Sequence, residues 1–180
     1  INKAANNGAT PLYIASENGH VEVASILAER GADINKARDD GVSPLIIASL
    51  KGHVEVVKVL VKNIADINHP QEASNNGVTP LIIASYNGHV EVVRVLVEKG
   101  ANINKADNDG CTPLFIASEM GNVEVVIVLV ERGDDINKAD NDGYTPLYRA
   151  SLQGHVEVVK VLVENIADIN HPQEASNNGV

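Results

Sequence analysis

Residues 34–66 read INKARDDGVSPLIIASLKGHVEVVKVLVKNIAD, and this unit recurs along the whole chain of 180 residues. Its most regular mark is a Thr or Ser followed by Pro and Leu, with the prolines at Pro11, Pro44, Pro80, Pro113 and Pro146. Successive prolines are 33, 36, 33 and 33 residues apart. A period of this length is typical of arrays in which one small unit stacks on the next. The sequence therefore predicts a single elongated array and no central globular core.

The first half of the unit predicts a turn followed by a short helix. Asp39, Asp40 and Gly41 form a polar cluster typical of a turn, in which glycine accepts a positive φ. Ser43 and Pro44 predict a helix start, because a hydroxyl caps exposed backbone amides and proline fits the first helical position. The next glycine along the chain is expected to end this helix.

The second half of the unit predicts a second helix, although its valines favour strands. Glu55, Lys58 and Lys62 are spaced by 3 and 4 residues, which places them on one helical face. We expect helix pairs near 10–17 and 20–30, repeated at steps of 33 or 36 residues. Neither helix is long enough to be stable alone, so packing between units must hold it.

Composition excludes several classes of function. The chain carries 14 basic and 24 acidic residues, a net charge of −10, and has no cluster of Lys and Arg for nucleic acid or anionic lipid. No apolar run approaches the roughly 18 residues of a membrane span. Cys111 is the only cysteine, which excludes an internal disulfide and favours a reducing compartment such as the cytoplasm. Because the chain begins and ends inside a unit, we expect it to be a piece of a longer array.

Residues 107–137, DNDGCTPLFIASEMGNVEVVIVLVERGDDIN, carry a family resemblance. They match almost throughout the pattern D-x-x-G-x-T-P-L-H-x-A-A-x-x-G-H-x-E-V-V-x-x-L-L-x-x-G-A-x-x-N of the ankyrin repeat. The resemblance covers the whole chain and implies an all-α solenoid of stacked antiparallel helix pairs with protruding β-hairpin loops, or fingers. The chain is then a single array with units at 1–33, 34–66, 67–102, 103–135 and 136–168 and a partial unit at 169–180.

Two units depart from this pattern in the same way. Ile64 and Ile166 replace the glycine that ends the second helix, and a finger three residues longer follows each. We expect Asn63 and Asn165 to take the left-handed conformation, which asparagine tolerates, and both isoleucines to turn inward. His69-Pro70 and His171-Pro172 should then begin wider fingers, because the residue before proline avoids helical geometry.

A long internal duplication accompanies these departures. Residues 52–78 and 154–180 are identical except for Lys62 against Glu164. Their offset is 102 residues, the length of three units. A block of three units has therefore been copied nearly whole, which favours a naturally expanding array.

Candidate catalytic and metal-binding residues have structural interpretations. The histidines His20, His53, His89 and His155 recur once per unit, and we expect them to hydrogen-bond backbone amides at helix starts, not a metal. No nucleophile with a neighbouring base and no phosphate-binding loop is present, so the sequence predicts a non-catalytic protein without cofactors. A glutamate also recurs in the first turn of each second helix, where the helix dipole favours negative charge. These glutamates are Glu22, Glu55, Glu91, Glu124 and Glu157.

Arg149 stands alone in a column that is otherwise isoleucine. A buried arginine without a partner would be costly, so this position is either partly exposed or paired. Glu119 on the preceding layer is the partner that we expect.

Positions that vary between units indicate where a partner binds. In the ankyrin family such positions lie on a concave surface that contacts other proteins. The residues that we predict for this contact are Val42, Leu50, Lys51, Val78, Tyr86, Asn87, Cys111, Glu119, Met120, Tyr144, Leu152 and Gln153.

Two functions follow from these observations. The first is a protein–protein interaction module whose partner is another protein, not nucleic acid or a membrane. The alternative is a structural or elastic spacer segment of a long array, which the duplication supports. The terminal units keep apolar outer faces, so end-to-end self-association is a further expectation.

Overall fold

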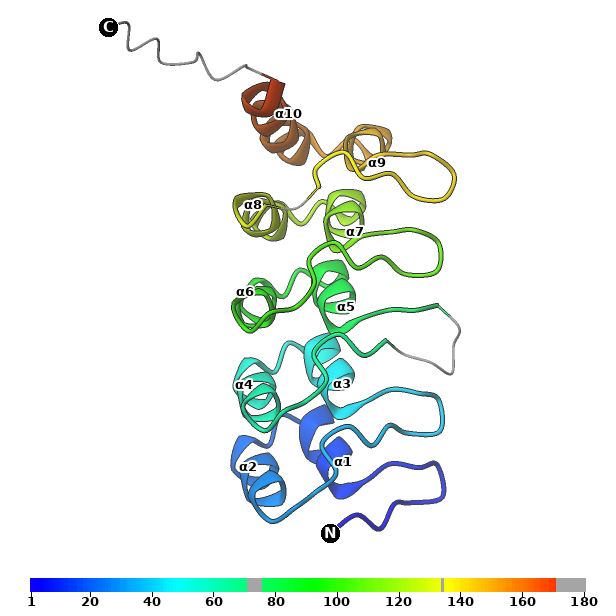
Figure 1. Cartoon of the computed structure of the whole chain (residues 1–180), viewed down its shortest axis with the longest axis vertical. Coiled ribbons are helices and arrows are strands. Elements are labelled where there is room, and N and C mark those ends of the chain that lie inside the picture. The colour runs from blue at the N-terminus through cyan, green and yellow to red at the C-terminus, as the bar shows by residue number, and fades with distance from the viewer. Residues whose placement is uncertain (71–75, 134, 171–180) are drawn as a thin grey trace, which may run out of the picture.

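The computed structural model describes residues 1–70, 76–133 and 135–170, and the side chains of these residues up to 166. In this part of the chain there are ten helices and no strand, so the all-α prediction is confirmed. Figure 1 shows the helix pairs stacked along one axis, with the odd-numbered helices forming the middle column. The even-numbered helices form a second column, and the long loops project on the opposite side as fingers.

The first helix of each pair begins at the Thr/Ser-Pro signal. In α7, the side-chain oxygen of Thr112 accepts a hydrogen bond from the Phe115 amide at 3.1 Å, and Pro113 takes the first helical position. The same cap starts all five odd-numbered helices, so these helix starts are confirmed. Their bounds are α1 Pro11–Glu17, α3 Pro44–Lys51, α5 Pro80–Tyr86, α7 Pro113–Met120 and α9 Pro146–Gln153.

The second helix of each pair carries the core. The two adjacent valines and the leucine of its inward face, Val92, Val93 and Leu96 in α6, are fully buried. Burying such a side chain contributes about 1.5–3 kcal/mol, so short helices gain stability from neighbouring layers. The apolar cluster continues from repeat to repeat through the stack. The even-numbered helices are α2 Val21–Glu29, α4 Val54–Lys62, α6 Val90–Glu98, α8 Val123–Glu131 and α10 Val156–Asn170.

The fingers are closed by turns. The Asp107 amide donates to the Cys111 carbonyl at 3.1 Å, and the Asp140 amide donates to the Tyr144 carbonyl at 2.9 Å. Neighbouring fingers are joined through backbone groups, as where the Asn141 amide donates to the Asp109 carbonyl at 2.9 Å. Each finger is therefore positioned by the finger before it.

The expectation for the first three-residue insertion is wrong. Asn63 has a φ of −95°, whereas Ile64 has a φ of +66° and is 86% exposed. The Asn63 side-chain amide donates back to the Val59 carbonyl at 2.8 Å and so holds Asn63 on the helix end. Ile64 occupies the place that Gly100 holds in the next repeat, with a φ of +91°. In the four repeats that are followed by a further helix pair, the residue at this place is left-handed, whether it is Gly31, Ile64, Gly100 or Gly133.

The second insertion differs from the first. Asn165 lies inside α10, which runs on to Asn170, so the left-handed conformation predicted for it is also wrong. Ile166 is half-buried against the main apolar cluster. The fingers predicted to begin at His69-Pro70 and His171-Pro172 fall largely on 71–75 and 171–180, outside the described residues. In the part of the chain that the structure describes, no helix is both long and apolar enough to cross a membrane.

Candidate binding surface

The surface between the odd-numbered helices and the fingers in Figure 1 is here called the inner face. The predicted contact residues lie at or next to the C-terminal ends of the odd-numbered helices, or on the finger residues just before these helices begin. The C-terminal ends of α5 and α7 present Tyr86, 50% exposed, and Met120, 37% exposed, from repeats that have neighbours on both sides. Two exposed apolar side chains on adjacent layers give this face an apolar centre. Large exposed apolar groups of this kind are typical anchors of protein interfaces.

The predicted residues fall into three classes of exposure. Val42 is 8% exposed and packs in a second apolar cluster with Ala9 and Tyr13, so it offers little surface. The half-buried members are Leu50, Val78, Cys111 and Glu119. The exposed members are Lys51, Tyr86, Asn87, Met120, Tyr144, Leu152 and Gln153.

Recurring histidines bind the ends of the odd-numbered helices, next to the inner face. The Nε2 atom of His155 lies 2.9 Å from the Glu119 carbonyl, in the last turn of α7 in the preceding repeat. His53 and His89 make the same contact with the carbonyls of Glu17 and Leu50, at 3.1 and 3.0 Å. The expectation that these side chains cap backbone amides is wrong for His20, His53 and His89, because α2, α4 and α6 have no side-chain cap. The rings of His53, His89 and His155 donate instead to helix-end carbonyls of the preceding repeat, which have no partner within their own helices.

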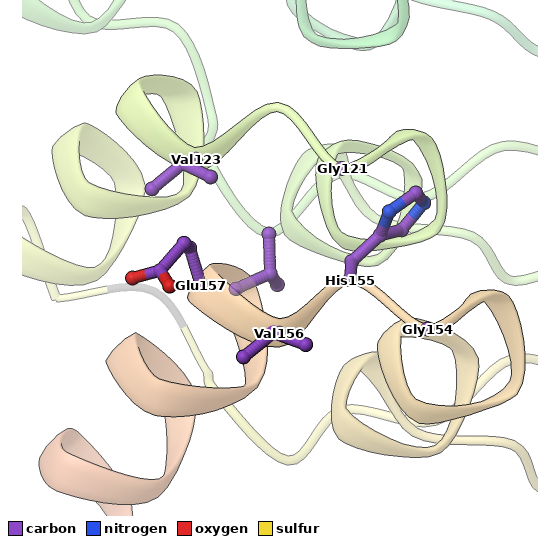
Figure 2. A pocket seen from close by; sticks show the side chains of 7 residues that line it. Gly121, Val123, Gly154, His155, Val156 and Glu157 are labelled. Atoms are coloured by element: carbon purple, nitrogen blue, oxygen red, sulfur yellow. The ribbon is translucent and has the colours of Figure 1, made fainter.

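A glycine makes room for each ring. Figure 2 shows His155 lying against Gly121, between α7 and the start of α10. A Cβ atom at Gly121 would lie 2.7 Å from the Nδ1 and Cε1 atoms of His155, and Gly121 has a φ of +73°. The shallow pocket in Figure 2 is lined mainly by valine and glycine, with His155 and Glu157 as its polar groups. We interpret it as a seam between repeats.

Asn122 replaces the histidine in the fourth repeat and keeps its role. Its Nδ2 atom donates to the carbonyls of Ser85 and Tyr86, at 2.7 and 3.0 Å. It lies against Gly88, where a Cβ atom would be 2.9 Å from its Oδ1. The backbone of Tyr86 is therefore fixed by the next repeat while its side chain remains exposed.

Arg149 is both paired and partly exposed. Its Nη1 atom lies 3.4 Å from Glu119 Oε1, as predicted, and its Nη2 atom lies 3.3 Å from Asp140 Oδ2. The guanidinium also lies over the rings of Phe115 and Tyr144, with its central carbon 5.4 and 4.9 Å from the ring centroids. These contacts fix the charge of Arg149 between two carboxylates and two rings.

A related cluster three repeats earlier was not visible in the sequence alone. Arg38, which ion-pairs with Asp40, lies over the Tyr13 ring at 5.0 Å. Tyr13 and Phe115 are 102 residues apart and take the same place, but the guanidinium comes from the finger in one cluster and from α9 in the other. The sequence carries one signal of this relation. The second repeat has Arg38 in its finger and Ile47 in its first helix, whereas the fifth repeat has Asp140 and Arg149 at the same two places.

Cys111 lies in a partly buried, negatively charged part of the inner face. Burial, together with the charges of Asp107, Asp140 and Asp109, raises the pKa of its thiol to about 12. The nearby carboxylates thus disfavour a further negative charge on the Cys111 sulfur. The thiolate is the nucleophilic form, so a raised pKa argues against a nucleophilic role for Cys111. In the described residues, no three His, Cys, Asp or Glu side chains gather closely enough to hold a metal ion.

Comparison with known proteins agrees with the repeat geometry. The family model described as ankyrin repeats, which spans three copies, matches residues 1–71, 31–107, 69–140 and 106–173. No curated protein matches the chain. The overlapping matches cover nearly the whole array of capped helix pairs and projecting fingers. The chain belongs to the ankyrin-repeat family.

Proposed function

We propose that the array is a non-catalytic protein-interaction module that binds a partner protein through its inner face. Ankyrin repeats are generally protein–protein interaction modules, and proteins built from them are typically non-catalytic scaffolds. The observation that carries the proposal is the exposure of Tyr86 and Met120 on adjacent layers. A free protein keeps such side chains in water at a cost that a partner can remove.

The rigidity of this surface supports the proposal. The backbone carbonyls of Tyr86 and Glu119, at the ends of α5 and α7, are held by side chains of the following repeats. A surface already fixed before binding loses less conformational entropy when a partner docks. The inner face is therefore suited to bind without rearrangement.

A library of short random peptides, selected on the immobilised chain, tests this function. We expect the selected peptides to lose about tenfold or more in affinity for the Tyr86→Ala/Met120→Ala double variant, because interface anchors carry most of the binding energy. Ile26→Ala is the control, since Ile26 is a 57% exposed apolar side chain of α2, outside the inner face. Peptides that bind the double variant as well as the parent chain would contradict the proposal.

The duplicated block favours a second candidate function. A spacer needs length and a regular repeat, and a copied block of three units supplies both. Under this function, selection would yield no peptide that depends on Tyr86 or Met120. The same experiment therefore separates the two functions.

A further inference from the structure

The carboxylates at the finger tips of the last two repeats have no cationic partner in the described residues. Asp109 and Asp142 are exposed and take part in no ion pair or side-chain hydrogen bond there. The turn itself is closed by Asp107 and Asp140, whose side chains accept backbone amides. The two tip carboxylates are therefore not needed to form the turns.

Other carboxylates of the array do have cations beside them. On the even-numbered helices, Glu55 pairs with Lys58 at 2.7 Å, and Glu157 pairs with Lys160 at 2.8 Å. In the finger of the second repeat, Asp40 stands at the place of Asp109 and pairs with Arg38. In the fingers of the fourth and fifth repeats an aspartate replaces that arginine, so Asp109 and Asp142 lack this partner.

Cations near the inner face of repeats three to five are already engaged. Arg149 is held between Asp140 and Glu119. Lys105 and Lys138, at the finger bases, donate to the backbone carbonyls of Asn68 and Asn104 at 2.9 Å. None of the three forms an ion pair with Asp109 or Asp142, so the carboxylates of the two tips remain open to a cation from a partner.

Four carboxylates surround Cys111, which lies on this face between the fingers and α7. Burial raises the pKa of its thiol most, and the charges of Asp107, Asp140, Asp109 and Glu119 raise it further. Tyr86 and Met120 present apolar surface on the adjacent helix ends. Negative charge thus borders an apolar centre.

We propose that the inner face of repeats three to five binds a basic protein segment that carries an apolar or aromatic anchor. The anchor packs on Tyr86 and Met120, and the Lys and Arg side chains of the segment pair with Asp109 and Asp142. This inference rests on the proposed function and adds the chemical class of the partner. Complementary charge of this kind speeds encounter and excludes acidic partners.

The test uses a fluorescent peptide in which Lys and Arg alternate with Leu and Phe, measured by anisotropy against the full chain. A second peptide replaces each Lys and Arg by Glu. We expect the basic peptide to bind, its affinity to fall as salt screens the charges, and the acidic peptide not to bind. Binding of the acidic peptide as tightly as the basic one would overturn the inference.

Matched variants separate a site from a general attraction. Asp109→Asn/Asp142→Asn removes two charges at the finger tips, and Glu124→Gln/Glu131→Gln removes two exposed charges on α8. We expect the first pair to weaken binding about three- to tenfold, as loss of two exposed ion pairs implies, and the second to change it little. Equal weakening by both pairs would reduce the effect to net charge and overturn the inference.

Failure of the inference is distinguishable from failure of the proposed function. If library peptides depend on Tyr86 and Met120 but show no excess of Lys and Arg, the interaction function stands and the basic partner is wrong. If no selected peptide depends on these two residues, the proposed function itself is wrong.

Discussion

Replacing Gly121 by alanine tests whether the histidine contacts join the repeats. Gly121 and Gly133 both lie in the fourth repeat, after α7 and α8, with φ values of +73° and +84°. An alanine at either place adopts a left-handed conformation that costs about 1–2 kcal/mol. Only at Gly121 would the new Cβ meet a neighbour, since nothing lies within 4 Å of the corresponding position at Gly133.

The structure gives the size of the expected difference. At 2.7 Å from two ring atoms, the Cβ of Gly121→Ala displaces His155 and breaks its bond to the Glu119 carbonyl. A hydrogen bond of this kind contributes about 0.5–1.5 kcal/mol net, and the Glu119 carbonyl is only partly buried, so water can reach it once the ring has moved. We expect Gly121→Ala to destabilise the array by about 1.5–3.5 kcal/mol and Gly133→Ala by about 1–2 kcal/mol.

Urea unfolding followed by circular dichroism measures both free energies. In a His155→Ala background, Gly121→Ala should cost no more than Gly133→Ala, because the ring that it strikes is absent. Equal destabilisation by the two single variants, or no coupling between Gly121→Ala and His155→Ala, would refute this account of the joint.

Four further outcomes are expected. Arg149→Ile restores the residue common at this position but leaves Asp140, whose side chain is 5% exposed, without its cation, so the variant should lose about 1–3 kcal/mol of unfolding free energy. Adding Asp140→Arg recreates the arrangement of the second repeat and should recover most of this loss, as measured by urea unfolding. Ser85→Ala removes a buried hydroxyl with no hydrogen-bond partner in the described residues and should raise the unfolding free energy by about 1 kcal/mol. Ile64→Gly relieves a left-handed β-branched residue and should stabilise by about 0.5–1 kcal/mol after the entropy of the freer unfolded chain is subtracted. Because the pKa of Cys111 is raised to about 12, iodoacetamide at pH 8 should react far more slowly with the folded chain than with the chain unfolded in urea. The stability that the protonated thiol contributes should be full below the unfolded pKa of about 8.5 and should be lost as the pH rises toward 12.

The helix pairs could be predicted from the sequence because their signals are local. The Thr112-Pro113 start and the polar spacing at Glu55, Lys58 and Lys62 depend only on residues within one turn or two of each other. The structure places α7 and α4 accordingly. Pairing of Arg149 with Glu119 was also predictable, because a charge in an isoleucine column requires a nearby partner.

The contacts between layers could not be read from one unit. His155 was interpreted as a local cap, whereas its ring bonds to a carbonyl 36 residues away. At the end of α4, local propensity favoured Asn63 as the left-handed residue, but the structure places the left-handed conformation at Ile64, where other repeats have glycine. In both cases the neighbouring repeat decides the conformation, and a pattern within one unit carries no information about that neighbour.

The duplicated segment has a consequence for how this protein changes over generations. Residues 52–78 and 154–180 differ at one position, so two copies of this array can be aligned with an offset of 102 residues as well as without one. The joint that follows the first of these segments is closed by His89, which bonds to the Leu50 carbonyl, and Leu152 stands at the equivalent place three units later. A gain or loss of one block therefore keeps a leucine carbonyl opposite this histidine, while Tyr148 and Arg149 take the places of Ile46 and Ile47 in the neighbouring layer. The array can change its reach in whole blocks and keep the histidine contact at each new joint.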